Sequence, residues 1–271
     1  MVQEYKNILN ENIVQRILTI IFLLPILLYF IHIGGFLIKS LMIVLSIFLS
    51  NEWYVITQKN KNLLPHITFI VLVAFIVATS FFLDFTFSIL SAILISFFYI
   101  FEIKVKKCIL GKNDKWLFYG FMYISIPLLI FIQIINLYEG KKILFCFLLI
   151  VFSTDIFSYI SGNIIKGPKI FPILSPTKTY SGTVLGVLFG SIIGVLFSLK
   201  WLNFIELPYV IIFCMIISLS AILGDLLISK IKRFFKVKDS GKLLPGHGGF
   251  LDRYDSIALS LVILFFLVNF F

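Results

Sequence analysis

The sequence predicts an all-α membrane protein, a polytopic bundle of about nine transmembrane helices. Of its 271 residues, 60% are hydrophobic and 13% are charged, whereas a soluble domain is about half apolar and a quarter charged. The apolar residues gather in runs near the length of about 20 residues that a helix needs to cross a bilayer. Basic residues fall between these runs. The formal charge of +10 therefore indicates orientation in a membrane, and we expect no nucleic-acid partner.

The predicted spans follow one another with short polar connections and without an internal repeat. Only Gly34 and its neighbours separate the first two, which predicts a tight helical hairpin. No hydrophilic stretch is long enough for a separate soluble domain. We expect one membrane domain over 1–271, with 1–140 as scaffold and 141–271 carrying the chemistry. The nine spans are predicted at 17–33, 35–53, 67–83, 86–101, 116–135, 143–159, 182–199, 209–229 and 256–271.

The distribution of Lys and Arg predicts the orientation of these spans. With the N-terminus in the cytoplasm, 19 of the 23 basic residues lie on the cytoplasmic side, as the positive-inside rule requires. Two of the inside loops, 161–181 and 230–255, are rich in Gly, Pro, Lys and hydroxyl residues. We therefore expect a multi-pass protein of the bacterial inner membrane, with its chemistry on the cytoplasmic side, where nucleotides are available.

An aspartate lies inside the sixth predicted span. At helical spacing Asp155 shares a face with Ser158, Tyr159 and Gly162. A carboxylate within a membrane is costly and normally faces a bundle interior or a watery cavity. A hydrogen bond to a neighbouring helix is the structural alternative. The functional interpretation is favoured because intramembrane acids commonly mark substrate or ion pathways.

Three more acids flank the 230–255 loop. Asp225 stands near the end of the eighth span, while Asp252 and Asp255 begin the ninth and share one helix face. The positive end of a helix favours acids in general, but this does not explain the glycine-rich segment 245–249 before them. Glycines permit tight turns close to a ligand. Carboxylate oxygens suit Mg²⁺ together with phosphates, so the three aspartates are predicted to bind Mg²⁺.

Basic side chains in the same loop are candidates for phosphate binding. Attraction to anionic lipid headgroups is the alternative for such clusters, and it is the preferred interpretation for Lys236 and Lys242. The phosphate-binding candidates are Lys232, Arg233, Lys238 and Arg253.

More than one role is possible for two further groups of polar residues. His247 could be a base, a phosphate donor or a residue that fastens the loop. In the earlier loop Lys178, with Ser175 and Thr179 beside it, could hold a phosphate. A helix cap before the seventh span is the alternative for Ser181.

At these residues the sequence resembles the phosphatidate cytidylyltransferases, also called CDP-diacylglycerol synthases. The Gly224-Asp225 pair and the 175–182 run fit that family, whereas Tyr254 stands where an aliphatic residue is usual. The Gly-basic pattern after the Asp155 helix also departs from the family's. The C-terminal signature matches, with its gaps, at Ser229, Lys232-Arg233, Lys238-Asp239, His247-Gly248-Gly249, Asp252-Arg253 and Asp255.

The resemblance implies that the protein joins CTP to phosphatidate, giving CDP-diacylglycerol and pyrophosphate, with Mg²⁺ as cofactor. It also implies a possible homodimer surrounded by membrane lipids. The residues predicted to act in catalysis are Asp225, Ser229, Lys232, Arg233, Lys238, Asp239, His247, Asp252, Arg253 and Asp255. Those predicted to bind substrate are Asp155, Tyr159, Ser175, Lys178, Thr179, Gly248 and Gly249.

Two other functions fit part of the pattern. An ion- or proton-coupled transporter would also carry intramembrane acids, but transporters often contain internal repeats. Another CDP-linked lipid headgroup transferase would carry a DGxxAR-type acidic motif, which this sequence lacks. Binding of CTP with magnesium would separate an enzyme from a transporter.

Overall fold

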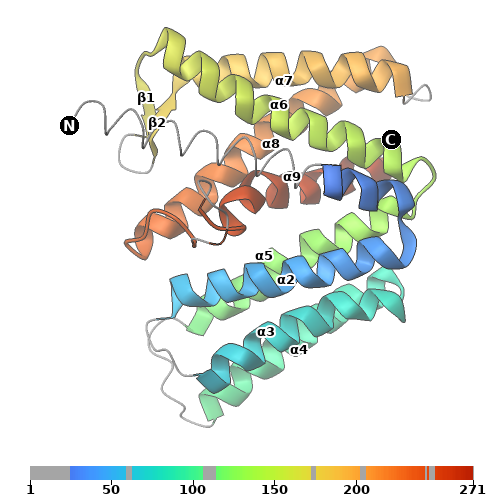
Figure 1. Cartoon of the computed structure of the whole chain (residues 1–271), viewed down its shortest axis with the longest axis vertical. Coiled ribbons are helices and arrows are strands. Elements are labelled where there is room, and N and C mark those ends of the chain that lie inside the picture. Colours follow the sequence, from blue (N-terminus) through green and yellow to red (C-terminus); the bar gives the residue numbers. More distant parts are fainter. Residues whose placement is uncertain are drawn as a thin grey trace. The chain divides into compact units, whose positions relative to one another are not determined.

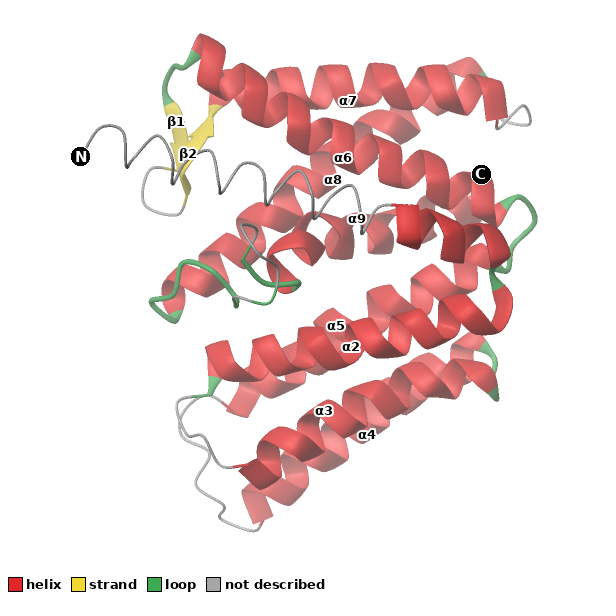
Figure 2. Cartoon of the chain, viewed as in Figure 1, coloured by secondary structure: helices red, strands yellow, loops and turns green. Residues whose placement is uncertain are grey.

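The computed structural model describes residues 25–58, 63–105, 114–171, 175–201, 206–241, 243 and 248–270. Residues 25–33 are helical and, as predicted, turn directly into the next helix at Gly34, whose φ of 72° is favourable for glycine. The other elements are α2 (Gly35–Thr57), α3 (Leu63–Ala78), η1 (Thr79–Phe81), α4 (Phe85–Val105), α5 (Asp114–Ile135), α6 (Gly140–Ile165), β1 (Lys169–Phe171), β2 (Ser175–Thr179), α7 (Tyr180–Trp201), α8 (Leu207–Phe234) and α9 (Leu251–Phe270) (Figures 1 and 2).

The predicted all-α membrane fold is confirmed. Each predicted span coincides with a helix, except that the first is described only from residue 25. Among the described residues, seven helices are long and apolar enough to cross a bilayer, from α2 to α8. The ninth predicted span coincides with α9, which is not one of the seven. The protein is therefore a multi-pass membrane protein.

The chain forms two compact units, each of which is described by itself. The first unit contains residues 1–125 and 237–253, and the second contains 126–236 and 254–271. The first unit thus includes α2, α3 and α4 together with the loop that leads into α9. The second includes α6, α7, α8, the β-hairpin and most of α9. That the chain acts as one membrane domain divided near residue 140 stays a prediction.

Aromatic side chains form the core of the first unit. Trp53 of α2 is buried and donates its indole N–H to the carbonyl of Trp116 on α5 at 2.8 Å. Gly120 provides the space for this ring, because a Cβ there would lie 2.3 Å from the indole nitrogen. On α3, Phe69 packs edge-on against Phe121, with ring centroids 4.7 Å apart. Large rings and a single glycine therefore fix where α2 meets α5.

A row of glycines brings α6 and α7 into close contact in the second unit (Figure 1). A Cβ at Gly186 would lie 1.9 Å from the Ser158 hydroxyl, and one at Gly190 would lie 2.2 Å from the Thr154 hydroxyl. Small residues at four-residue spacing are how membrane helices approach closely when lipid removes any hydrophobic drive between them. The row begins at Gly182 and therefore positions the hairpin end of α7 as well.

The exposed face of α7 indicates that lipid, and not water, surrounds this helix. Its buried positions are glycine and serine, whereas its exposed positions are large and apolar. This arrangement is the reverse of a soluble helix, which buries its large apolar residues, and it fits a helix surrounded by lipid. The exposed apolar residues include Val184, Leu188, Ile192 and Leu196.

A short β-hairpin follows α6, at a place where the sequence predicts a loop. Strands β1 and β2 are antiparallel, with Lys169 opposite Thr179. Positive φ angles at Lys166 and Gly167 turn the chain from α6 into β1. The Thr179 hydroxyl then accepts the backbone N–H of Gly182 at 3.1 Å and so caps the first turn of α7. The hairpin therefore holds β2, and Lys178 within it, against the ends of two helices.

Candidate functional site

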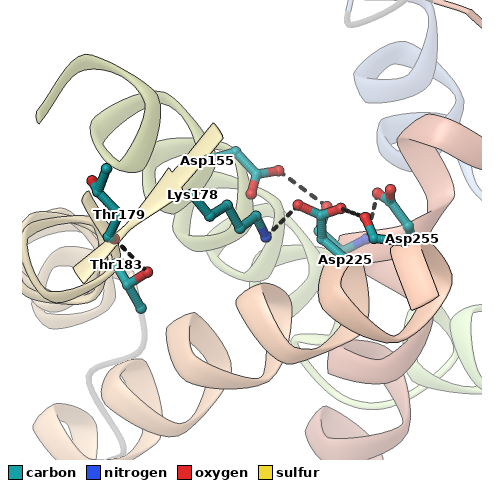
Figure 3. A network of polar contacts seen from close by, with 8 residues as sticks. Asp155, Lys178, Thr179, Thr183, Asp225 and Asp255 are labelled. Atoms are coloured by element: carbon teal, nitrogen blue, oxygen red, sulfur yellow. Dashed lines mark hydrogen bonds and ion pairs between the residues drawn. The ribbon is translucent and has the colours of Figure 1, made fainter. Parts of the chain in front are cut away.

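Helices α8 and α9 and the hairpin bring several charged groups together in the second unit (Figure 3). Lys178 reaches from β2 and forms an ion pair with the carboxylate of Asp225 on α8. Ser229, one turn further along α8, donates its hydroxyl to the same carboxylate at 3.3 Å. The predicted residues Asp225, Ser229 and Lys178 are thus in contact although they come from separate segments.

A second carboxylate lies beside Asp225. Asp255, in the first turns of α9, is buried, and its side chain interacts with that of Asp225. Gly224 makes this approach possible, because a Cβ there would lie 2.5 Å from the carbonyl oxygen of Asp255. The buried Lys232 lies near enough to act electrostatically on both carboxylates.

Asp155 joins the same group from α6. The Ser256 hydroxyl donates to its carboxylate at 3.0 Å, and the backbone N–H of Ser256 bonds to Asp255 at 2.8 Å. Ser256 therefore links the two acids, and Asp155 acts electrostatically on Asp255. The contact with Ser256 matches the helix–helix hydrogen bond considered as the structural alternative, and it also places Asp155 within the acidic group.

In the described part of the chain, this group contains both acidic and basic side chains. Three carboxylates, from Asp155, Asp225 and Asp255, are accompanied by two lysines, Lys178 and Lys232. Adjacent carboxylates repel one another in a medium of low dielectric constant unless a proton or cation neutralises them. Paired carboxylates with nearby ammonium groups can hold a cation and an anionic phosphate at the same place.

The signature loop is held by Asp252 in the first unit. One oxygen of its carboxylate accepts the backbone N–H groups of Ser240 and Gly249, each at 2.9 Å. Gly248 has a φ of 84°, and a Cβ there would lie 2.5 Å from the same oxygen. This explains the glycines of the motif, because the backbone passes directly over the carboxylate. Asp252 thus closes the loop by bonding both of its ends.

A second acid holds the same loop, and the sequence analysis did not identify it. Glu52 on α2 is buried and accepts the hydroxyl of Ser240 at 2.8 Å. It also accepts the backbone N–H groups of Phe250 and Leu251, both at 2.9 Å. The signal was present, because an acid inside an apolar span is costly enough to require a role. Nothing comparable in the sequence marked Ser240 or Ser256.

The other predicted site residues lie as follows. Arg233 is half-buried near the end of α8, and Tyr159 on α6 is exposed. Lys238 and Asp239 are exposed at the start of the loop, and Arg253 is exposed on α9. His247 and the side chain of Ser175 lie outside the described residues. Asp252 belongs to the first unit and Asp225 and Asp255 to the second, so their meeting in one site stays a prediction.

Two local expectations are corrected by the structure. Ser158 and Gly162 face α7, as their contacts with Gly186 and Gly182 show, whereas Asp155 bonds to α9. The predicted common face of α6 is therefore divided between two neighbours. The cap of α7 is Thr179 and not Ser181. Ser181 instead donates its hydroxyl to the carbonyl of Lys166 at 2.5 Å and fastens the turn before β1.

The donor chemistry of the acidic group suits a hard cation such as Mg²⁺, which prefers oxygen ligands. Asp225 and Asp255 supply carboxylate oxygens side by side. Within the described ranges, no group of three or more His, Cys, Asp or Glu side chains converges as a ready ligand set. The two carboxylates therefore fit a cation that takes its remaining ligands from phosphates and water.

Comparison with known proteins decides the family. The sequence matches the cytidylyltransferase family over residues 14–271, which is nearly the whole chain. The chain belongs to this family. The match also extends over the N-terminal helices, where the sequence alone offered no motif. The described residues that resemble the family signature lie in both units, with the Asp252 loop in the first and the Asp225–Asp255 pair in the second.

Three relatives of this chain are each named phosphatidate cytidylyltransferase. The phosphatidate cytidylyltransferase of Rickettsia conorii is 42% identical over 154 residues, which cover 54% of this chain and 66% of that protein. The protein of that name from Rickettsia bellii is 38% identical over 58% of this chain and 70% of its own length. The one from Bacillus subtilis is 36% identical over 55% and 56%. The matched segments thus span from about half to about 70% of these relatives.

The ion pair between Lys178 and Asp225 predicts a measurable coupling. Replacing Lys178 by Met removes the ion-pair partner of the Asp225 carboxylate, so the melting temperature in detergent should fall. Lys178→Met combined with Asp225→Asn should be less destabilised than the sum of the single variants, with a coupling on the order of 1 kcal/mol. The pair Lys142–Glu139, whose atoms are 2.7 Å apart and whose lysine is exposed, is the control.

The control cycle of Lys142→Met and Glu139→Gln should give a coupling below about 0.5 kcal/mol, because solvent screens the charge of the exposed Lys142. Equal couplings for the two pairs would show that Lys178 and Asp225 do not form a special charge pair.

Proposed function

We propose that the protein is a phosphatidate cytidylyltransferase, which joins CTP and phosphatidate to form CDP-diacylglycerol and pyrophosphate. Membership of the cytidylyltransferase family and the name shared by its relatives support this function. The observation that carries it is the paired carboxylates Asp225 and Asp255, flanked by Lys178 and Lys232 at the boundary of apolar helices. Such a group suits the joining of two anionic phosphates, one of them attached to a lipid.

The reaction proposed at this group is a displacement at phosphorus. A phosphate oxygen of phosphatidate forms a bond to the α-phosphorus of CTP, and the bond from that phosphorus to the bridging oxygen breaks. Pyrophosphate leaves with the electron pair. Little covalent work is required of the protein in phosphoryl transfer, so its task is to position the reactants and to balance their charge. Lys178 and Lys232 would supply positive charge toward the phosphates.

Asp225 and Asp255 would hold Mg²⁺, and Asp252 is proposed to join them. The ion would neutralise phosphate charge that builds up as pyrophosphate leaves. Ser229 and Ser256 would keep the carboxylates in place, because each donates to one of them or to its neighbour Asp155. Charge held in a dry and fixed arrangement stabilises a transition state more than the same charge in water.

The proposed reaction requires three components together. Purified protein should release pyrophosphate only when CTP, phosphatidate and a divalent ion are all present. The measurement is pyrophosphate release with each component omitted in turn. Release that does not depend on phosphatidate would rule out the lipid as acceptor.

The carboxylates should be essential for turnover. Asp225→Asn, Asp252→Asn and Asp255→Asn each keep the side-chain shape but remove one charge, and we expect turnover to fall about a hundredfold or more. Lys236→Ala, at an exposed position, is the control and should keep most of its activity. Turnover is measured against magnesium concentration. Near wild-type turnover and magnesium dependence in all three Asn variants would contradict the metal site.

We also propose that the protein lies in the inner membrane, with its N-terminus and the loops 161–181 and 230–255 in the cytoplasm. The positive-inside distribution of Lys and Arg supports this orientation. Single cysteines at the exposed positions Lys238 and Tyr138 test it, in a chain whose three native cysteines are replaced. An impermeant thiol reagent added outside spheroplasts should label position 138 and not 238. The opposite pattern would overturn the orientation.

A further inference from the structure

Glu52 is a buried acid within an apolar helix of the first unit. It lies in α2, one of the helices long and apolar enough to cross a membrane, yet only 2% of its surface is exposed. An ionised carboxylate in such a place costs several kcal/mol unless hydrogen bonds replace its lost water. Glu52 therefore needs a set of donors, and the contacts it makes show which segment supplies them.

Three donors to Glu52 come from the signature segment of the first unit. One carboxylate oxygen accepts the backbone N–H of Phe250, and the other accepts that of Leu251 and the hydroxyl of Ser240. Phe250 and Leu251 stand at the N-terminus of α9, where backbone N–H groups have no partner within the helix. A negative charge there is also favoured by the helix dipole. The Glu52 carboxylate on α2 thus caps the N-terminus of α9.

Two glycines of the loop lie tightly against the Glu52 carboxylate. A Cβ at Gly249 would lie 2.2 Å from the Glu52 carboxylate, and one at Gly241 would lie 2.9 Å from it. One turn before Glu52, Phe48 of α2 stacks on Phe250 with ring centroids 4.9 Å apart. The loop is therefore docked onto α2 by a carboxylate and an aromatic contact together.

Glu52 and Asp252 hold the same two ends of the loop. Ser240 donates its hydroxyl to Glu52 and its backbone N–H to Asp252. At the other end, Gly249 donates to Asp252 and Phe250 donates to Glu52. The loop between them is closed at its base by two carboxylates, one from α2 and one from α9. Loss of Glu52 would leave Asp252 and the Phe48 contact to hold a segment that carries much of the family signature.

We propose that Glu52 is a positioning residue for the cytidylyl transfer, holding Ser240 and residues 249–251 and through them the carboxylate of Asp252 in a working arrangement. The inference rests on the proposed function. Glu52 accepts three hydrogen bonds from the loop, so its role is to position the loop and not to contact substrate. Misplacement of supporting groups by about 1 Å can lower a rate a hundredfold, so an intact carboxylate at position 52 should be needed for full turnover.

Glu52→Gln tests the proposal, because the amide keeps the size of the side chain but turns an NH₂ group toward at least one donor of the loop. We expect kcat to fall tenfold or more, with a smaller change in KM for CTP. Hydrogen exchange at residues 249–251 should quicken, while exchange in α3 stays as in the wild type. Glu102→Gln, which removes the same charge from an exposed position on α4, should change neither.

Ser240→Ala removes one donor from Glu52 and keeps the proposal testable if Glu52→Gln fails to fold. We expect a few-fold fall in kcat, and the double variant should be little worse than Glu52→Gln alone, because both act through one contact. Faster exchange at 249–251 with unchanged kcat would overturn the proposal and leave Glu52 a purely structural cap. Unchanged hydrogen exchange at residues 249–251 in Glu52→Gln would overturn the proposal too. Absence of turnover in the wild type would instead defeat the proposed function.

Discussion

Carboxylates inside an apolar helical protein have to be neutralised or fully hydrogen-bonded, and this constraint organises the described structure. In the second unit, Asp225 is neutralised by Lys178 from the hairpin, and Asp155 is bonded by Ser256 from α9. In the first unit, Glu52 takes its donors from the loop and the start of α9. Each acid therefore draws a distant segment toward it, and those segments carry the family signature.

Small residues make these contacts possible. Gly224 allows α9 to approach α8 so closely that Asp255 lies beside Asp225. Gly186 and Gly190 allow the same closeness between α6 and α7, and the hairpin with Lys178 is anchored at the end of that pair. A larger side chain at any of these glycines would separate the helices and, with them, the charges. Glycine at these positions thus allows both close helix packing and the close approach of the charged side chains.

The spans could be predicted from the sequence because length and hydropathy alone determine them in a bilayer. The aspartates could be identified for a related reason, since a charge in an apolar run is conspicuous. The β-hairpin was missed because its residues resemble a loop in composition. Glu52 was overlooked beside Trp53 at the end of its span, and its donors lie almost 200 residues away in the chain. Such partners depend on the folded structure and leave no local pattern.

The central claim is that the clustered carboxylates and lysines support transfer of a cytidylyl group to a lipid phosphate. Tracing of labelled phosphorus tests it most directly. With CTP labelled at the α-phosphorus, the label should pass into the lipid phase when phosphatidate and magnesium are present. With CTP labelled at the γ-phosphorus, the label should remain in water as pyrophosphate. Lipid that gains the γ label, or that gains no α label, would contradict the account.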